Sequence, residues 1–287
     1  MTDAPYFRHV RRSPCGIAAT VARESWTVIA ERCRMAVEAA LPDASAELYF
    51  NLGPNGRHAS RTAQRTLPHR AAWIVGPHDR PIYIAKETRD CDIVGIRLHP
   101  WMAEAVLGVP AHEVRNAMVD LEGLWGARVD EIRGRIFETG DPVARIAIVE
   151  RAVAERAKRG AHLASTESGL AARLCHEAER DADVTIGELA ARHGLTHRRL
   201  IELFERTVGL KPKAYHRVRR LRRVFHLIDE KPRPTWTTIA HRCGYFDQAH
   251  LINDFRQLTG VLPREYEATR SSVGQGFVPH VLASATA

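Results

Sequence analysis

Residues Thr237–Tyr266 read TTIAHRCGYFDQAHLINDFRQLTGVLPREY and predict two short helices joined by a tight turn. Gly244 can end the first helix, because glycine adopts a positive φ at little cost. Asp247 is placed to cap the second helix, and Gly260 followed by Pro263 ends it. Its apolar side chains recur at helical spacing: Leu251, Phe255 and Leu258. A helix, a glycine turn and a helix form the plan that can lay a helix in the major groove of DNA.

The same landmarks occur earlier in the chain, which makes chance an unlikely source of the pattern. The offset is 50 residues up to Gly194 and Gly244, and 51 residues from Leu200 and Leu251 onward, so the second unit has one extra residue in its turn. The matching sets are Leu189-Ala190, Gly194, Leu200, Phe204, Gly209, Pro212 and Tyr215, and Ile239-Ala240, Gly244, Leu251, Phe255, Gly260, Pro263 and Tyr266.

Residues 168–270 resemble the double helix-turn-helix domain of AraC/XylS-type transcriptional regulators. The resemblance is carried by IAHRCGYFDQAHLINDFRQLTGVLPREY, which has Ile-Ala, Gly-aromatic, Asp-Gln-x-His-Leu, Phe-Arg, Thr-Gly, and then Pro and Tyr in the family's order. It covers about the last third of the chain. It implies a sequence-specific DNA-binding protein.

Residues early in a recognition helix contact base edges. Arg198 could hold guanine through two hydrogen bonds, Ile201 could touch a thymine methyl group, and Gln248 or Asn253 could read adenine. A phosphate contact or a solvated side chain is the alternative for each of them, and His250 could instead hydrogen-bond within the turn. The predicted base-reading residues are His197, Arg198, Ile201 and Glu202 in the first unit and Gln248, Ala249, His250 and Asn253 in the second.

Residues 212–229 predict one helix between the two units. At 1.5 Å per residue it spans roughly 27 Å, near the ~34 Å of one DNA turn, so both recognition helices could enter successive major grooves. A run of basic residues without acidic ones lies along it and favours contact with the DNA backbone, although a solvated helix face is the alternative. The predicted phosphate contacts are Thr196, Lys211, Lys213, Arg217, Arg219, Arg220, Arg222, Arg223, His241, Arg242 and Arg256.

The first hundred residues are β-rich and predict a barrel or sandwich of short strands. The chain then becomes helical. We expect strands at 16–22, 26–30, 46–52, 72–75, 82–85 and 93–98, and helices at 101–107, 110–115, 129–137 and 142–158. The tail from Phe277 to Ala287 is expected to be loosely held.

The N-terminal half also resembles a known domain, the one often joined to AraC-type DNA-binding domains. The segments are LYFNLG (48–53), VGPHDRP (75–81), VGIRLHPWMAEAVLGVP (94–110) and DLEGLWG (120–126). The resemblance implies an α+β chain: a cupin-like barrel followed by helices, which senses a signal, dimerises or does both, and then the all-α DNA-binding domain. We expect domains at 1–160 and 161–287, the second with its core at 168–270, joined by a short hinge at 158–166.

Composition sets the remaining expectations. The chain has 287 residues, a net charge of +8 and no apolar run long enough for a signal peptide or membrane span. Five scattered cysteines without a Cys-x-x-Cys pair fit a reducing cytoplasm: Cys15, Cys33, Cys91, Cys175 and Cys243. Promoter DNA is the expected partner, and RNA polymerase, an unidentified small-molecule effector and a second copy of the chain are further candidates.

The sequence predicts no enzymatic activity, cofactor or metal site. Metal-binding cupins use two close histidines and a carboxylate, whereas His58, His69, His78 and His99 lie far apart. The alternatives are a thiol-responsive regulator, an enzyme or metal-dependent barrel fused to a DNA-binding domain, and a regulator without a small-molecule ligand. Three aromatic residues could line a pocket but suit a plain core better: Trp73, Tyr83 and Trp101.

Overall fold

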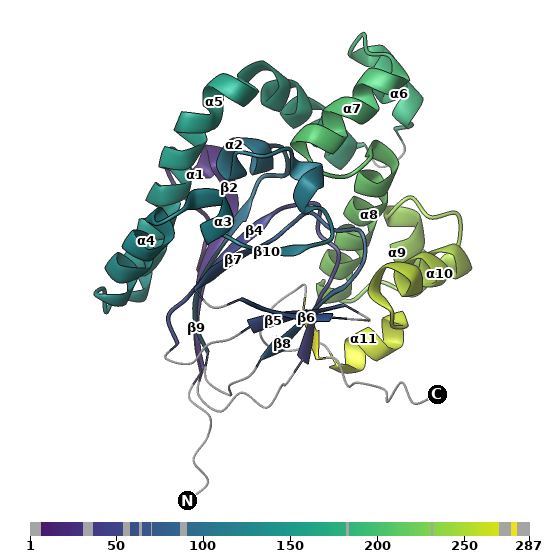
Figure 1. Ribbon diagram of the computed structural model, residues 1–287. Helices are drawn as coiled ribbons and strands as arrows, with labels where there is room; N and C mark the ends of the chain where they lie inside the picture. Colours follow the sequence, from purple (N-terminus) through teal and green to yellow (C-terminus); the bar gives the residue numbers. More distant parts are fainter. Residues whose placement is uncertain are drawn as a thin grey trace, which may run out of the picture.

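The computed structural model describes residues 7–30, 37–53, 58–62, 65–69, 71–86, 91–181, 184–230, 232–269 and 277–279. Two antiparallel sheets form the N-terminal part, and helices form the C-terminal part (Figure 1). The α+β class and the order of a sheet-rich domain followed by a helical one are therefore confirmed. Cys33 lies outside the described residues.

Each sheet joins strands that are distant in sequence. The first sheet has the order β1-β2-β9-β4-β7-β10, with β1 (Phe7–Arg12), β2 (Ala22–Ala30), β9 (Cys91–Leu98), β4 (Glu47–Asn51), β7 (Ala72–Val75) and β10 (Met118–Asp120). The second has the order β11-β3-β8-β5-β6, with β11 (Phe277–Pro279), β3 (Val37–Ala40), β8 (Ile82–Lys86), β5 (His58–Thr62) and β6 (Arg65–His69).

The central strand β9 contributes to two cores, because alternate side chains of a strand point to opposite faces. Ile93 belongs to an aromatic core with Trp26, Tyr49 and Trp73, in which the rings of Tyr49 and Trp73 stack at 5.5 Å. A Cβ on Gly95 would lie 2.4 Å from the Trp26 ring, so this position needs glycine. Trp73 is therefore a core residue, which is the role that the sequence favoured over lining a pocket.

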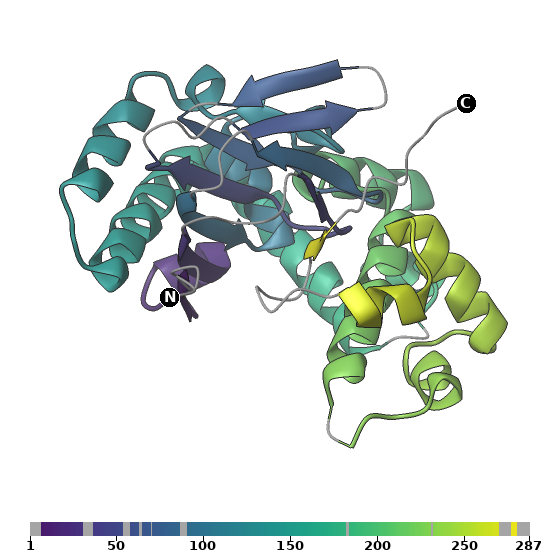
Figure 2. The same ribbon diagram turned by 90° about the horizontal axis from the view of Figure 1, so that it is seen from below.

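The other face of the first sheet packs against helices, through Val94, Ile96 and Leu98 of β9. Figure 2 shows the green and yellow C-terminal helices beside the sheets, on the side away from the teal helix α4 (Arg128–Phe137). The helices of this part are α1 (Ala18–Val21), η1 (Pro100–Met102), α2 (Ala103–Leu107), η2 (Ala111–Val114), α3 (Glu122–Trp125), α4 (Arg128–Phe137) and α5 (Pro142–Arg180).

Three expectations need correction. The segment 16–22 forms a turn and α1 rather than a strand. The expected hinge at 158–166 lies inside the continuous helix α5. The tail is not wholly loose either, because β11 pairs with β3.

The C-terminal helices have local start and stop signals. Thr185 and Glu188 form a capping box, and Asp247 accepts a hydrogen bond from the backbone nitrogen of His250 at 2.7 Å. Gly244 and Gly260 adopt φ of 72° and 78°. The helices are α6 (Ile186–Arg192), α7 (His197–Thr207), α8 (Pro212–Asp229), α9 (Trp236–Arg242), α10 (Gln248–Thr259) and α11 (Pro263–Thr269).

The repeated landmarks have the same structural role in both units. Phe204 packs edge-on against Tyr215 at 5.5 Å, and Phe255 packs edge-on against Tyr266 at 5.7 Å. Each aromatic pair lies in the core of its own unit. The α8 helix has the bounds that the sequence predicts, and it contributes to both cores.

Candidate nucleic-acid interface

The N-terminal half of α7 presents its side chains to solvent. His197, Arg198 and Glu202 are exposed, and Ile201 is half-buried. Arg198 has a side chain that is 89 % exposed, and its Nε donates to Glu202 Oε1 at 2.8 Å. The four residues predicted to read bases in the first unit therefore share the accessible face of one helix.

The start of α10 is equally accessible. Gln248, Ala249, His250 and Asn253 are all exposed. The Nδ1 atom of His250 lies 3.5 Å from the backbone nitrogen of Phe246, and its ring packs edge-on against Tyr245 at 5.3 Å. His250 thus also has the contact within the turn that the sequence left open as an alternative.

Phe246 is a candidate contact residue that sequence reasoning missed. Its side chain is 85 % exposed and lies just before the Asp247 cap of α10. An exposed large aromatic side chain at a recognition-helix N-terminus suits contact with a nucleic-acid surface. The sequence feature that could have identified Phe246 is its place in the turn, directly after the Gly-Tyr pair of the motif.

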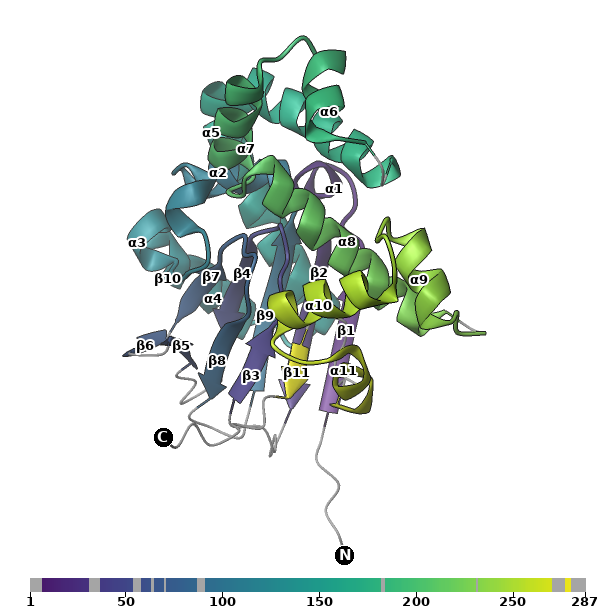
Figure 3. The same ribbon diagram turned by 90° about the vertical axis from the view of Figure 1, so that its right-hand side faces the viewer.

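The α8 helix runs between the two units, with α7 near one end and α10 alongside the other (Figure 3). Lys211, Lys213 and Arg256 are exposed and have the accessibility that phosphate contact requires. On the flanking helix α9, His241 and Arg242 are exposed, and Arg242 donates to Glu230 at 2.7 and 2.9 Å. Thr196 is exposed, and its hydroxyl caps α7 by accepting from the backbone nitrogen of Arg199 at 3.2 Å.

Two arginines of α8 hold the second unit together. Arg217 forms an ion pair with the buried carboxylate of Asp254, and Arg220 lies 3.8 Å from the same carboxylate. Arg220 also donates to the carbonyl of Gly244 at 3.2 Å and lies over the Tyr245 ring. These guanidinium groups position α9 and α10 against α8, which is a structural role in addition to the predicted one.

The other three arginines of α8 face the end of α5 and the N-terminal sheets. Arg219 lies 3.2 Å from Glu179 at the end of α5, and Arg223 donates to the backbone carbonyl of the same residue. Arg222 is only 7 % exposed, and its Nε lies 3.5 Å from Asp43 of the barrel. A phosphate contact by Arg222 is therefore incompatible with this arrangement, and we correct it to a structural arginine.

Asp43 is the centre of a buried charge cluster between the two parts of the chain. Arg97 approaches its carboxylate at 3.6 Å from β9, and Arg222 approaches from α8. Burial alone would raise the pKa of Asp43, but the charges of Arg97, Arg222 and Arg219 hold that pKa well below its usual range. Burial lowers the pKa of Arg222, and Asp43 opposes this effect.

Two more carboxylates bind arginines across the same interface. Glu179 forms an ion pair with Arg23 and accepts from the Tyr215 hydroxyl at 3.2 Å. Glu104 of α2 accepts from Arg206 of α7 at 2.8 Å. Sequence reasoning missed this interface, because its partners are far apart in the chain and no local pattern joins them.

Two domain families match the sequence. One, described as a helix-turn-helix domain, matches residues 189–269, and a domain of unknown function (DUF6597) matches residues 13–120. These matches identify a helix-turn-helix domain in the C-terminal part, and the chain resembles AraC/XylS-type transcriptional regulators. The helix-turn-helix domain thus follows a separate N-terminal domain. No curated protein sequence matches the regulator.

Two solved structures show how far the similarity extends, one along most of the chain and one along about a third of it. The unsaturated fatty acid-bound ToxT from Vibrio cholerae strain SCE256 aligns with 90 % of the regulator and 94 % of its own chain, at a TM-score of 0.50 and 8 % identity. A probable AraC family transcriptional regulator from Rhodopseudomonas palustris CGA009 aligns with 34 % of the regulator and 93 % of its own chain, at 27 % identity and a TM-score of 0.31.

The histidines and cysteines of the regulator were the candidates for metal binding and for thiol reactivity. Among the described residues, no group of three or more histidine, cysteine, aspartate or glutamate side chains could hold a metal ion. His78 is buried with each ring nitrogen 2.9 Å from a backbone carbonyl, which is a structural environment. Among the described helices, none combines the length and apolar character of a membrane span.

The described cysteines differ in accessibility. Cys15 is exposed, whereas Cys91, Cys175 and Cys243 are buried. Burial raises the pKa of Cys175 to about 12 and that of Cys243 to about 11. Because the thiolate is the reactive form, these two thiols are poor sensors.

Proposed function

We propose that the regulator binds promoter DNA sequence-specifically by placing α7 and α10 in successive major grooves. The observation that carries the proposal is the matched exposure of the two recognition-helix N-termini, on units that the single helix α8 connects. The length of α8 corresponds to roughly 27 Å, close to the ~34 Å of one DNA turn. Lys211, Lys213 and Arg256 supply backbone contacts.

The N-terminal domain senses a signal, forms a homodimer or does both in this proposal. It is non-enzymatic and uses no cofactor, and the regulator works in the cytoplasm with RNA polymerase as a further partner. The similarity in fold to a ToxT solved with a fatty acid supports a small-molecule effector. The domain boundaries at 160 and 161 fall inside α5, so the helix itself is the connection between the domains.

In-vitro selection from a random duplex library tests the DNA-binding proposal. We expect two sequence blocks about one helical turn apart, with an affinity that falls as salt rises. Tight binding without a sequence preference would contradict the assigned base readout. Absence of binding at low salt, with and without candidate effectors, would contradict DNA binding itself.

The Arg198→Ala variant tests one base contact. We expect a loss of about 1–3 kcal/mol in binding the selected sequence and a relaxed preference at one position, because the bidentate contact to guanine is removed. Selection followed by a binding titration measures both effects. Arg135→Ala, an exposed arginine of α4 in the N-terminal domain, is the control and should bind like the parent. An unchanged preference in Arg198→Ala would remove this residue from the readout.

A further inference from the structure

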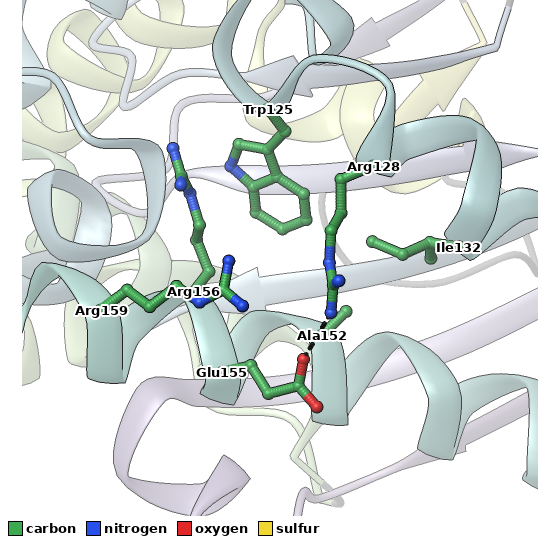
Figure 4. Close-up of a pocket in the computed structure, with 7 residues that line it drawn as sticks. All are labelled: Trp125, Arg128, Ile132, Ala152, Glu155, Arg156 and Arg159. Atoms are coloured by element: carbon green, nitrogen blue, oxygen red, sulfur yellow. Dashed lines mark hydrogen bonds and ion pairs between the residues drawn. The ribbon is translucent and has the colours of Figure 1, made fainter.

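A surface pocket lies where α3 and α4 meet α5, away from the recognition helices. Its cavity volume is about 60 Å³, and it is partly open to solvent. Figure 4 shows the Trp125 ring on one side of this space and the carboxylate of Glu155 on the other. The lining residues are Trp125, Arg128, Ile132, Ala152, Glu155, Arg156 and Arg159.

The pocket has an excess of positive charge. Arg128 donates to Glu155 at 2.8 Å, which balances one of the three guanidinium groups against the one carboxylate. Arg159 is exposed and has no hydrogen bond or ion pair to any residue that the structure describes. The Nε atom of Arg156 is buried and has no hydrogen-bond partner in that same part of the chain. Arg159 thus retains exposed donors for an anion, and the guanidinium of Arg156 adds a second positive charge beside it.

The apolar side of the pocket is held in place before any ligand arrives. The Trp125 indole donates from Nε1 to the carbonyl of Val106 at 3.1 Å. The guanidinium of Arg156 lies over the same ring at 5.9 Å and donates to the carbonyl of Leu124 at 3.2 Å. Ile132 and Ala152 add aliphatic surface. A rigid apolar wall with a few polar groups is the usual composition of a small-molecule site.

We propose that this pocket binds a small organic anion. Its oxyanion group contacts Arg159 and is attracted by the neighbouring charge of Arg156, because guanidinium groups match carboxylate and phosphate oxygens in geometry and charge. Its short apolar body lies against Trp125 and Ile132. A carboxylate and a phosphate monoester share this chemistry, and the space suits a molecule of only a few heavy atoms.

The pocket is also connected to the first helix-turn-helix unit. Trp125 holds Val106 of α2, and in the same helix Glu104 accepts from Arg206 of α7. An anion that moves Arg156 or Trp125 can therefore shift α2 and, through it, α7. This regulatory consequence rests on the proposed function in DNA binding, whereas the binding site itself does not.

Saturation-transfer NMR on the full-length protein tests the site with three probes. Butyrate and butyl phosphate carry the two kinds of oxyanion on the same apolar body, and butylamine carries the opposite charge. We expect transfer to at least one of the two anions at millimolar concentration, and none to butylamine. The stronger of the two signals identifies the preferred head group.

The variant Arg159→Gln should reduce the anion signal at least fivefold, since it removes the free guanidinium without disturbing a buried contact. Arg151→Gln changes another exposed arginine of α5, which is not among the lining residues, and should keep the full signal. Circular dichroism verifies that both variants fold. Equal signals from the two variants, a butylamine signal as strong as that of the anions, or no anion signal would overturn the proposal. Because no DNA is present, none of these results bears on DNA binding, and failure to bind DNA would leave this site standing.

Discussion

Replacing Asp43 by asparagine is expected to lower the free energy of unfolding by about 3–5 kcal/mol, the usual cost of removing one partner of a buried ion pair. The backbone nitrogen of Ser45 donates to Asp43 Oδ1 at 2.9 Å, and the asparagine keeps an oxygen that can accept this hydrogen bond. It loses the negative charge that Arg97 and Arg222 share in the interior. Urea denaturation, followed by far-ultraviolet circular dichroism, measures the change.

Asp130→Asn is the matched control for this variant. Asp130 also pairs with an arginine, at 3.5 Å from Arg133, but its side chain is 68 % exposed. Solvent screens such a pair, so we expect a change within about 0.5 kcal/mol. The double variant Asp43→Asn/Arg222→Met should recover part of the lost stability, because it removes the buried charge of Arg222 that has lost its partner, whereas Arg97 keeps its ion pairs with Glu47 and Glu24. A similar stability in Asp43→Asn and Asp130→Asn would contradict a buried charge cluster at Asp43.

The C-terminal helices were predictable because their signals are local. The bounds of α8 follow from Pro212 at its start and the proline-limited loop after Asp229. The turn glycines and the Asp247 cap act within a few residues of their own positions. Such features need no knowledge of the rest of the fold.

The interface between the domains was not predictable from those signals. The basic run of α8 suits phosphate contact by composition, yet Arg222 meets Asp43, which lies far earlier in the chain. No periodicity distinguishes an arginine that faces DNA from one that faces another domain. The pocket was unpredictable for the same reason, because Trp125 of α3 and Arg128 of α4 meet Arg156 and Arg159 of α5 only in the folded chain.

The expected hinge at 158–166 shows that composition alone can suggest a linker where packing against another helix keeps the chain helical. The segment 158–166 is small and polar, which is typical of a linker, and it contains Gly160. A Cβ at Gly160 would lie 2.2 Å from the carbonyl oxygen of Ala105 in α2. The glycine thus permits α5 to pass close to α2, and the helix continues through it. Strands such as β5 (HASRT) escaped prediction because their residues do not alternate in polarity.

The second large effect is expected at Asp254, where the two units differ. The first unit has the fully buried Leu203 at the corresponding position, whereas the second has a carboxylate that is 7 % exposed. Asp254 pairs with Arg217 and accepts from the Tyr245 hydroxyl at 3.0 Å. Burial raises the pKa of Tyr245, so this hydroxyl remains a donor. The carboxylate therefore joins α10 both to α8 and to the turn that precedes it.

Asp254→Ala should cost about 3 kcal/mol of stability, because it leaves a buried hydroxyl and a partly buried guanidinium without their acceptor. Since Arg217 is 34 % exposed and can regain water, the cost lies at the lower end of the range for buried pairs. In DNA selection, the block assigned to α10 should weaken while the block assigned to α7 remains, because only the second unit loses its fixed orientation. Asp130→Asn should retain both blocks. Equal weakening of the two blocks would show that α8 transmits the change and that the units do not read DNA independently.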